Sequence, residues 1–149
     1  MSSRILLVYF THTGMTGQIA KLIRRVTDCD EEQIIPKVPY PEDVFKTIKQ
    51  VRHDGPLYRP VINEFTHDVK KYGTVIIGTP VWTDGLPPPV LTFLEANDWR
   101  GVKIFPFFST GGVYLDVYPA LQSKCEGAAI ANPLYLVYDL NGRFLDLRE

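Results

Sequence analysis

RILLVYFTHTGMTGQIAKLI, residues 4–23, joins an apolar run to a helix-like segment through a short polar loop. Arg4–Phe10 is an apolar run of the kind that a parallel sheet buries on both faces. Gly14–Thr27 spaces its apolar residues along one face of a helix. The stretch therefore predicts a strand, a ligand-sized loop and a helix, which together open an α/β fold.

The same alternation continues along the chain and predicts the fold class. Further strands are expected at Gln33–Val38, Gly73–Thr79, Val102–Ser109 and Ala129–Tyr138, and further helices at Pro41–His53, Glu64–Tyr72, Pro87–Asn97 and Asp116–Cys125. About five repeats of strand and helix predict one α/β domain, residues 1–149, with a doubly wound, five-stranded parallel sheet. Pro106 lacks the N–H group that a strand needs, and we expect a bulge there.

Composition limits the classes of function. With 45% hydrophobic and 22% charged residues, the chain has the composition of a soluble globular protein. No apolar run approaches the roughly 20 residues of a membrane span, and the first residues lack the pattern of a secretory signal. We therefore expect a cytoplasmic protein without a membrane association. A net charge of −1 argues against general nucleic-acid binding.

The two cysteines do not suggest a special chemistry. Cys29 and Cys125 lie far apart and neither belongs to a CxxC pair, so neither a disulfide framework nor a zinc site is expected. We interpret both as reduced structural thiols, and we expect no metal.

The loop after the first expected strand suits an anion. A helix that begins at this loop directs free N–H groups and the positive end of its dipole towards a ligand. Thr11, Thr13 and Thr16 add uncharged donors, and Gly14 allows a close approach to the backbone. The loop has neither the lysine of a nucleoside-triphosphate loop nor a GxGxxG pattern. It predicts a single terminal phosphate; the alternative is that the threonines are only helix caps.

Two further loops follow later strands and would meet at the same edge of the sheet. Trp82 stands in the loop Gly78–Gly85 and offers a flat surface to a planar ring. Ser109–Gly112 forms a compact turn whose backbone could reach polar atoms of that ring. Each signal is weak alone, but the three in this order indicate a ligand with a phosphate and a flat ring.

With these motifs, the chain resembles the flavodoxins, specifically short-chain flavodoxin-like proteins. THTGMT matches the family's [T/S]x[T/S]GxT phosphate loop, VIIGTPVW its strand and GxPxW loop, and FFSTGG its strand and [S/T]GG loop. PPPVLTFLE and YGTVIIG are also similar, so that the resemblance runs from Arg4 to about Tyr138. It implies a three-layer α/β/α architecture with strand order 2-1-3-4-5.

The resemblance implies flavin mononucleotide (FMN) as the cofactor. It assigns the phosphate to Thr11, His12, Thr13, Gly14, Met15 and Thr16, one face of the ring to Thr79, Pro80, Val81 and Trp82, and the polar edge of the ring to Ser109, Thr110, Gly111 and Gly112. The His12 side chain is expected to turn to solvent. The Asp84 carboxylate either lowers the flavin potential or is simply solvated.

By the same resemblance, the protein would carry low-potential electrons between a flavin reductase and acceptor enzymes, with no residue acting as acid, base or nucleophile. Two alternatives stay open. A flavin or quinone reductase that uses NAD(P)H could have the same fold, and so could a non-redox flavin-binding module that acts through partners.

Two features depart from the family pattern. Carriers of this type are strongly acidic as a rule, whereas this chain is almost neutral, and we interpret its acidic run Asp28–Glu32 as a solvated turn. Flavodoxin-like domains usually end in a helix, but Asn141–Gly142 between two apolar runs, Leu134–Leu140 and Arg143–Leu147, predicts a hairpin or short tail. Apolar sheet surface would then be left uncovered, and a homodimer is one way to cover it.

Overall fold

The computed structural model describes residues 4–112, 115–139 and 141–144. Its strands form one parallel sheet in the order β2-β1-β3-β4-β5, with β6 also paired to β4, which confirms the expected order 2-1-3-4-5. The strands are β1 (Ile5–Tyr9), β2 (Asp30–Gln33), β3 (Thr74–Pro80), β4 (Lys103–Thr110), β5 (Ala129–Ile130) and β6 (Leu134–Val137).

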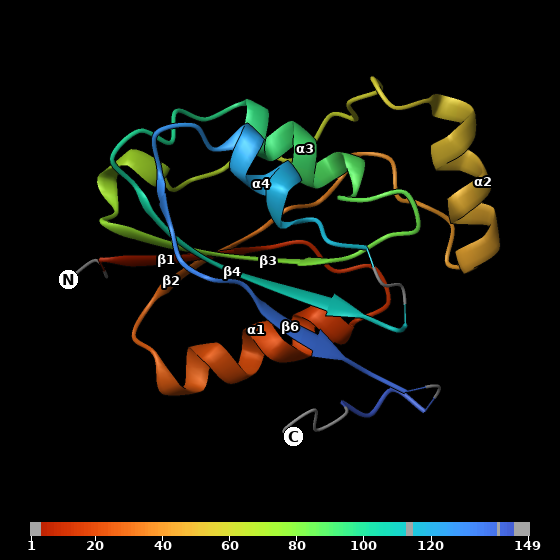
Figure 1. Cartoon of the computed structure of the whole chain (residues 1–149), viewed down its shortest axis with the longest axis horizontal. Coiled ribbons are helices and arrows are strands. Elements are labelled where there is room, and N and C mark those ends of the chain that lie inside the picture. The colour runs from red at the N-terminus through yellow and green to blue at the C-terminus, as the bar shows by residue number, and fades with distance from the viewer. Residues whose placement is uncertain (1–3, 113–114, 140, 145–149) are drawn as a thin grey trace.

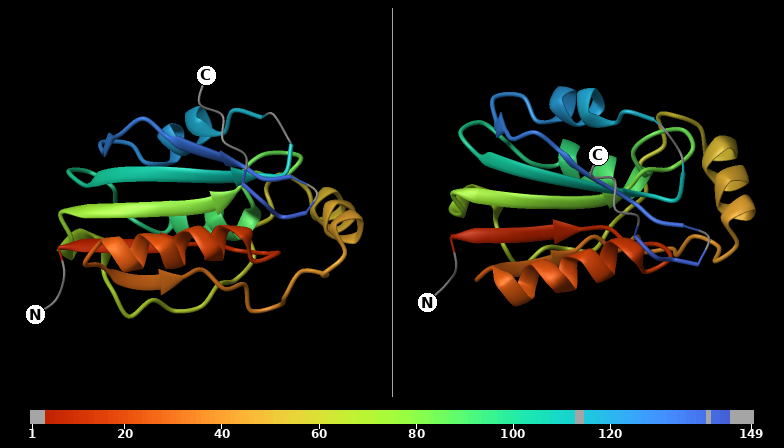
Figure 2. Two further views of the ribbon diagram at one scale, coloured as in Figure 1. Left: turned by 90° about the horizontal axis from the view of Figure 1, so that it is seen from below. Right: turned by 60° about the horizontal axis from the view of Figure 1, so that its bottom comes forward.

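The helices make the layers on either side of this sheet. They are α1 (Met15–Val26), α2 (Val44–Asp54), α3 (Pro88–Glu95) and α4 (Tyr118–Lys124), with a 3₁₀ turn, η1 (Val69–Lys71). Figure 1 shows α1 on one face and α3 with α4 on the other, as the three-layer expectation required. Helix α2 differs, because it stands beyond the carboxyl ends of the strands and covers neither face (Figures 1 and 2).

The central strands bury alternate residues in two separate clusters, as expected for strands that are covered on both sides. On the α1 face, Leu7 and Phe107 pack with Ile19 and Ala20. The larger cluster fills the space under α3 and α4. Its fully buried members include Leu6, Val8, Val75, Ile77, Val90, Leu94, Ile104, Phe108 and Leu121.

Pro106 does not cause the expected bulge. Residues Lys103–Ser109 of β4 stay in continuous register with β3, and Ile77 lies opposite Pro106. The carbonyl of Ile104 accepts from Ala131 on the outer side of β4, and alternate residues of a strand face the same neighbour. The missing N–H of Pro106 therefore faces the gap between β5 and β6, where the partner strand is interrupted.

The second strand lies earlier than expected. The acidic run contributes β2 (Asp30–Gln33) and is not a solvated turn, because its backbone pairs with β1 while its side chains find partners. Tyr72 donates to Asp30 at 2.5 Å, and Arg24 lies 2.6 Å from Glu31. Charged side chains are tolerated here because β2 is an edge strand.

Residues 35–37, which we had expected in that strand, pair instead with residues 61–63. Lys37 donates to the carbonyl of Val61, and Asn63 donates to that of Ile35. This antiparallel contact closes the base of the excursion 38–60 that carries α2. The chain thus leaves the sheet and returns to it at one point.

The helix expected at Glu64–Tyr72 is wrong apart from η1. The Glu32 carboxylate accepts hydrogen bonds from the N–H groups of Thr66 and His67, at 2.7 and 3.0 Å, and from the Thr66 hydroxyl. These bonds occupy donors that could otherwise enter a helix and hold the segment in a loop.

The last expected strand, Ala129–Tyr138, is divided into β5 and β6, both parallel to β4. The predicted hairpin follows it, since Tyr138 and Phe144 form an antiparallel bridge and Asp139 donates to the carbonyl of Arg143 at 2.8 Å. Gly142 makes the turn with φ at 74°. Leu140 and residues 145–147 of the expected pair of runs lie outside the described residues.

In the described part of the chain, no helix covers one part of the α1 face. Phe105 and Leu134 lie on this face, since they alternate with Phe107 and Leu136, which pack in the α1 cluster. Their side chains are 49% and 56% exposed. Apolar surface is thus uncovered at the β4–β6 side of the sheet.

Candidate functional site

A cavity of about 830 Å³ lies between α2 and the loops that follow β1, β3 and β4, at the carboxyl end of the sheet. Val44, Phe45, Ile48 and Val51 of α2 form one wall, and residues 80–86 after β3 form the other. The volume is within the range of pockets that hold one cofactor-sized molecule. A mostly apolar wall suits a flat ring more than a charged group.

The phosphate loop leads into α1 beside this cavity. Gly14 caps the helix with φ at 97°, a conformation that favours glycine, and a Cβ there would meet nothing within 4 Å. The Thr11 hydroxyl accepts from the N–H of Gly17 at 3.1 Å, so that this threonine is a helix cap, one of the two roles considered. Among the described residues, the N–H groups of Met15 and Thr16 have no acceptor and stay available to an anion.

Buried contacts join the phosphate loop to the other two loops. The hydroxyls of Thr16 and Ser109 are hydrogen-bonded at 2.8 Å, and both side chains are buried. The N–H of Val81 donates to the carbonyl of Ser109 at 2.9 Å. The three loops that the sequence singles out therefore meet at one edge of the sheet.

Trp82 lies in a tight turn on the cavity wall. Its N–H and carbonyl both pair with Gly85, at 2.9 and 3.1 Å. Phe10, His12 and Tyr40 contact the indole edge-on, with ring centroids 5.3–5.6 Å away. These neighbours hold the indole in a fixed position, as a stacking surface requires.

His12 points inward and does not turn to solvent, contrary to our expectation. The Thr47 hydroxyl donates to the carbonyl of Pro41 at 2.7 Å, so that His12 Nε2, 3.3 Å away, must be the donor in its bond to Thr47. The ring also packs against Trp82. His12 thereby connects the phosphate loop to α2.

Asp84 is neither freely solvated nor an isolated charge. Its two oxygens accept from Arg52 Nε and Nη2 at 3.0 and 3.2 Å across the mouth of the cavity. Hydrogen bonds from Arg52 hold the pKa of Asp84 below its usual value. Because the guanidinium compensates the carboxylate, the expected lowering of a flavin potential by Asp84 is largely offset.

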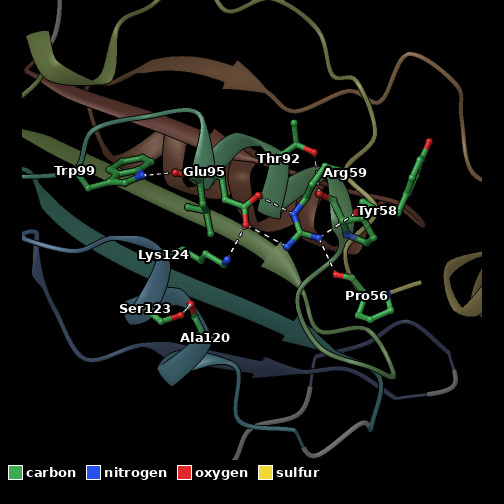
Figure 3. A network of polar contacts seen from close by, with 11 residues as sticks. Pro56, Tyr58, Arg59, Thr92, Glu95, Trp99, Ala120, Ser123 and Lys124 are labelled. Atoms are coloured by element: carbon green, nitrogen blue, oxygen red, sulfur yellow. Dashed lines mark hydrogen bonds and ion pairs between the residues drawn. The ribbon is translucent and has the colours of Figure 1, made fainter. Parts of the chain in front are cut away.

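A polar network anchors the segment that follows α2 (Figure 3). Arg59 donates to both oxygens of Glu95, at 2.8 and 3.1 Å, and to the carbonyls of Pro56 and Tyr58. Lys124 reaches the same carboxylate at 2.6 Å. Glu95 on α3 thus fixes one end of the excursion, while α2 itself buries only Thr47.

The structure brings the fourteen expected cofactor-binding residues to one region but does not place all of them on the cavity. Six line it, namely His12, Thr13, Pro80, Val81, Trp82 and Gly111. Met15 and Thr16 begin α1, which Thr11 and Gly14 precede. Ser109 and Thr110 end β4, which Gly112 follows. Thr79 does not line the cavity, because it still belongs to β3, is fully buried and donates to the carbonyl of Pro80.

The sequence analysis missed two groups on the wall. The apolar positions Val44, Ile48 and Val51 recur at helical spacing, and this pattern could have predicted the wall of α2, but we assigned it no role in the site. Tyr138 also lines the cavity. It follows β6 immediately, and the rule that ligands sit after parallel strands could have found it.

Metal and thiol chemistry find no support in the described part of the chain. Within residues 4–112, 115–139 and 141–144, no three His, Cys, Asp or Glu side chains are placed to hold a metal ion. Cys29 and Cys125 are both free thiols, and burial raises the pKa of Cys125 to about 12. None of the helices in these ranges is long and apolar enough to cross a membrane.

The donor set fits a ligand with a phosphate at one end and a flat apolar ring at the other. Neutral hydroxyls and helix N–H groups suit the phosphate, and the Trp82 wall suits the ring. Fold and site define a doubly wound α/β protein of the nucleotide-binding kind, with its site at the carboxyl end of the sheet.

Comparison with known proteins gives the family. The family model described as Flavodoxin matches residues 4–137, and the chain belongs to this family. No curated protein matches the chain.

Solved structures share the fold. The chain is similar to a protein from Bacteroides uniformis assigned as a flavoprotein, with 24% identity over 92% of each chain and a TM-score of 0.79. A flavoprotein from Lactobacillus acidophilus, solved in complex with FMN, is 20% identical over 88% of this chain and 91% of its own, with a TM-score of 0.69. Oxidised flavodoxin 1 from Bacillus cereus is 21% identical over 91% of this chain and 84% of its own, with a TM-score of 0.54.

Proposed function

We propose that this protein is a cytoplasmic electron carrier that takes low-potential electrons from a reductase and delivers them to acceptor enzymes. Its cofactor is FMN. One observation carries the proposal. The uncharged phosphate loop and Trp82 line the same cavity of about 830 Å³. The complex of the similar Lactobacillus acidophilus flavoprotein with FMN supports it.

Bound FMN would supply the redox chemistry, and the chain would bind and tune it. The first N–H groups of α1 and the Thr13 hydroxyl hold the phosphate. Trp82 packs against the ring, and an electron-rich indole disfavours a negatively charged reduced ring. The Arg52–Asp84 pair adds little net charge, so that the potential depends mainly on stacking and on backbone hydrogen bonds.

The test is a spectrum of the purified protein after mixing with FMN and removal of the unbound fraction. We expect retained flavin that is reduced anaerobically in two resolved one-electron steps. The variant Trp82→Ala should weaken FMN binding about 5- to 150-fold, because base-sized stacking contributes about 1–3 kcal/mol, whereas Trp82→Phe should lose less. No retained flavin would reject FMN binding, and retained flavin that cannot be reduced would favour the non-redox module.

A second function is favoured by one observation. One side of the cavity is lined by apolar residues of α2, and an apolar wall opposite Trp82 suits a flat acceptor. The protein would then be a flavin-dependent reductase that takes hydride from NAD(P)H and reduces a quinone or a free flavin. Rapid oxidation of NADPH by the flavin-loaded protein and a quinone would favour this function. No turnover without a separate reductase would favour the carrier.

We also propose a homodimer through the uncovered face at Phe105 and Leu134. A second copy would cover this exposed apolar surface. Light scattering measures the mass in solution. A mass of 16.9 kDa, that of one chain, would contradict the homodimer. Phe105→Lys should shift a dimer to monomer, while an exposed apolar residue elsewhere, as in Leu57→Lys, should not.

A further inference from the structure

The imidazole of His12 contacts both walls of the cavity. His12 belongs to the phosphate loop, and its half-buried side chain lines the cavity. Its Nε2 lies 3.3 Å from the Thr47 hydroxyl on α2. Its ring meets the Trp82 indole edge-on, with centroids 5.6 Å apart and the two planes at 72°. One side chain thus touches the α2 wall and the Trp82 wall together.

On the α2 side, His12 contacts the one residue that this helix buries. Thr47 is that residue, and its hydroxyl donates to the carbonyls of Pro41 and Asp43, at 2.7 and 3.1 Å. Because these bonds use the single hydroxyl proton, Thr47 Oγ1 accepts the Nε2–H of His12. The phosphate loop is therefore bonded to α2 at the point where the helix is best buried.

A second polar contact between α2 and the Trp82 loop is more exposed. Arg52 and Asp84 are bonded across the mouth of the cavity, but both side chains are about half exposed. Solvent screens such an ion pair, so that it fixes the helix weakly. The bond from His12 to Thr47 is part-buried and is screened less.

On the other side, three rings contact the indole of Trp82. Phe10 and Tyr40 lie edge-on to it and are themselves buried. Of the three rings, His12 alone lines the cavity. His12 therefore supports the indole at the surface that a ligand would meet.

We propose that His12 is a positioning residue for the flavin ring, which holds Trp82 and α2 as two walls of one cavity. The proposal rests on the proposed binding of FMN and deepens it. The resemblance to the family assigned His12 to the phosphate, whereas its imidazole contacts the walls that would enclose the ring. The phosphate is left to the backbone N–H groups at the start of α1.

Walls that are fixed in advance make binding more favourable. When Trp82 and α2 are already held in the free protein, the ligand does not have to order them. Loss of the imidazole should therefore affect every ligand that carries the flavin ring. FMN and riboflavin share this ring, but riboflavin lacks the phosphate. A contact of His12 with the phosphate would instead affect FMN alone.

Flavin fluorescence titration of the full-length protein gives the dissociation constants of FMN and riboflavin. We expect His12→Ala to weaken both by the same factor, about 2- to 12-fold, the effect of ordering one side chain on binding. Thr13→Val is the opposite control, because loss of a hydroxyl proposed to hold the phosphate should weaken FMN alone. His53→Ala, at an exposed histidine of α2 that does not line the cavity, should change neither affinity.

Two further variants separate the two contacts of the imidazole. His12→Phe keeps a ring against Trp82 but has no donor for Thr47, whereas His12→Gln keeps an N–H donor and lacks the ring. In the flavin-free protein, hydrogen exchange in α2 should be faster in His12→Phe than in wild type, while the rate in α4 is unchanged. His12→Gln should restore the slower exchange. In a Thr47→Val background, His12→Phe should have no further effect on α2.

Three results would overturn the proposal. They are a larger loss for FMN than for riboflavin in His12→Ala, unchanged affinities for both flavins, or exchange in His12→Phe that rises equally in α2 and α4. The last result would indicate a general loss of stability and no local role. If the wild-type protein binds neither flavin, the proposed function fails, and the role of His12 at the ring fails with it. Wild-type binding combined with any of the three results rejects only the role of His12.

Discussion

At the residue scale, Tyr40 has two opposing effects on the stability of the fold. Its ring packs edge-on against Trp82 and supports the cavity wall. Within the described residues, however, its hydroxyl is buried without a hydrogen-bond partner, and burial raises its pKa to about 12. The ring stabilises the fold, whereas the oxygen costs desolvation energy that no bond repays.

Tyr40→Phe should therefore raise the free energy of unfolding of the FMN-free protein, by about 1 kcal/mol. The ring contact with Trp82 is kept, and the unpaired oxygen is removed. Urea denaturation measures the change. Tyr72→Phe is the opposite control, because the Tyr72 hydroxyl donates to Asp30 and its loss should destabilise. Destabilisation by Tyr40→Phe would indicate a partner for its hydroxyl in solution.

At the scale of elements, α2 differs from the other α-helices described here because it buries no apolar residue. It has a side-chain cap, since Asp43 accepts from the N–H of Lys46 at 3.0 Å, but Thr47 is its only buried residue. Helices in proteins owe most of their stability to packing of an apolar face. The apolar face of α2 borders the cavity, where a bound ligand would supply the missing contact.

Native-state hydrogen exchange should accordingly show faster exchange in α2 than in α1, where Ile19 and Ala20 are buried in the sheet. Addition of FMN should slow exchange in α2 and leave the rate in α4 nearly unchanged. Equal protection of α1 and α2 without FMN would contradict the view that α2 is held mainly at its ends.

At the scale of the whole molecule, Glu95 connects parts that are distant in sequence. Arg59 after α2 and Lys124 on α4 both bond its carboxylate, and the hydrogen bond from Arg59 is the main cause that lowers its pKa to about 2. The side chain is 34% exposed, so solvent screens these ion pairs and the gain is modest.

The lowered pKa predicts a dependence of stability on pH. A carboxylate whose pKa falls on folding stabilises above its unfolded value, about 4.5, and this stabilisation is lost as the pH falls towards 2. Glu95→Gln should therefore destabilise at pH 6, and its difference from wild type should shrink towards pH 2. Thermal unfolding at both pH values measures this. Glu64→Gln, at an exposed glutamate, should show little difference at either pH, and a pH-independent effect of Glu95→Gln would contradict the prediction.

Most of the fold could be predicted from local sequence. Apolar runs such as Leu6–Val8 and Ile104–Phe108 signal buried strands whatever surrounds them. Apolar periodicity signals α1 and, together with proline in the first turn, α3. The predictions were wrong for segments whose structure depends on residues distant in the sequence. The acidic β2 depends on pairing with β1, and Glu32 holds Thr66 and His67 out of a helix. In both cases the interacting segments are not adjacent in the sequence.

The sequence by itself determined the class of fold and the order of the binding loops, because strand and helix periods and turn residues act over a few positions. The tertiary structure alone decided that α2 leaves the sheet and forms a wall of the cavity, and that Arg52 compensates the charge of Asp84. These contacts join residues far apart in the chain. Their geometry follows from how the strands align and from which surfaces are left to pack, which no local pattern contains.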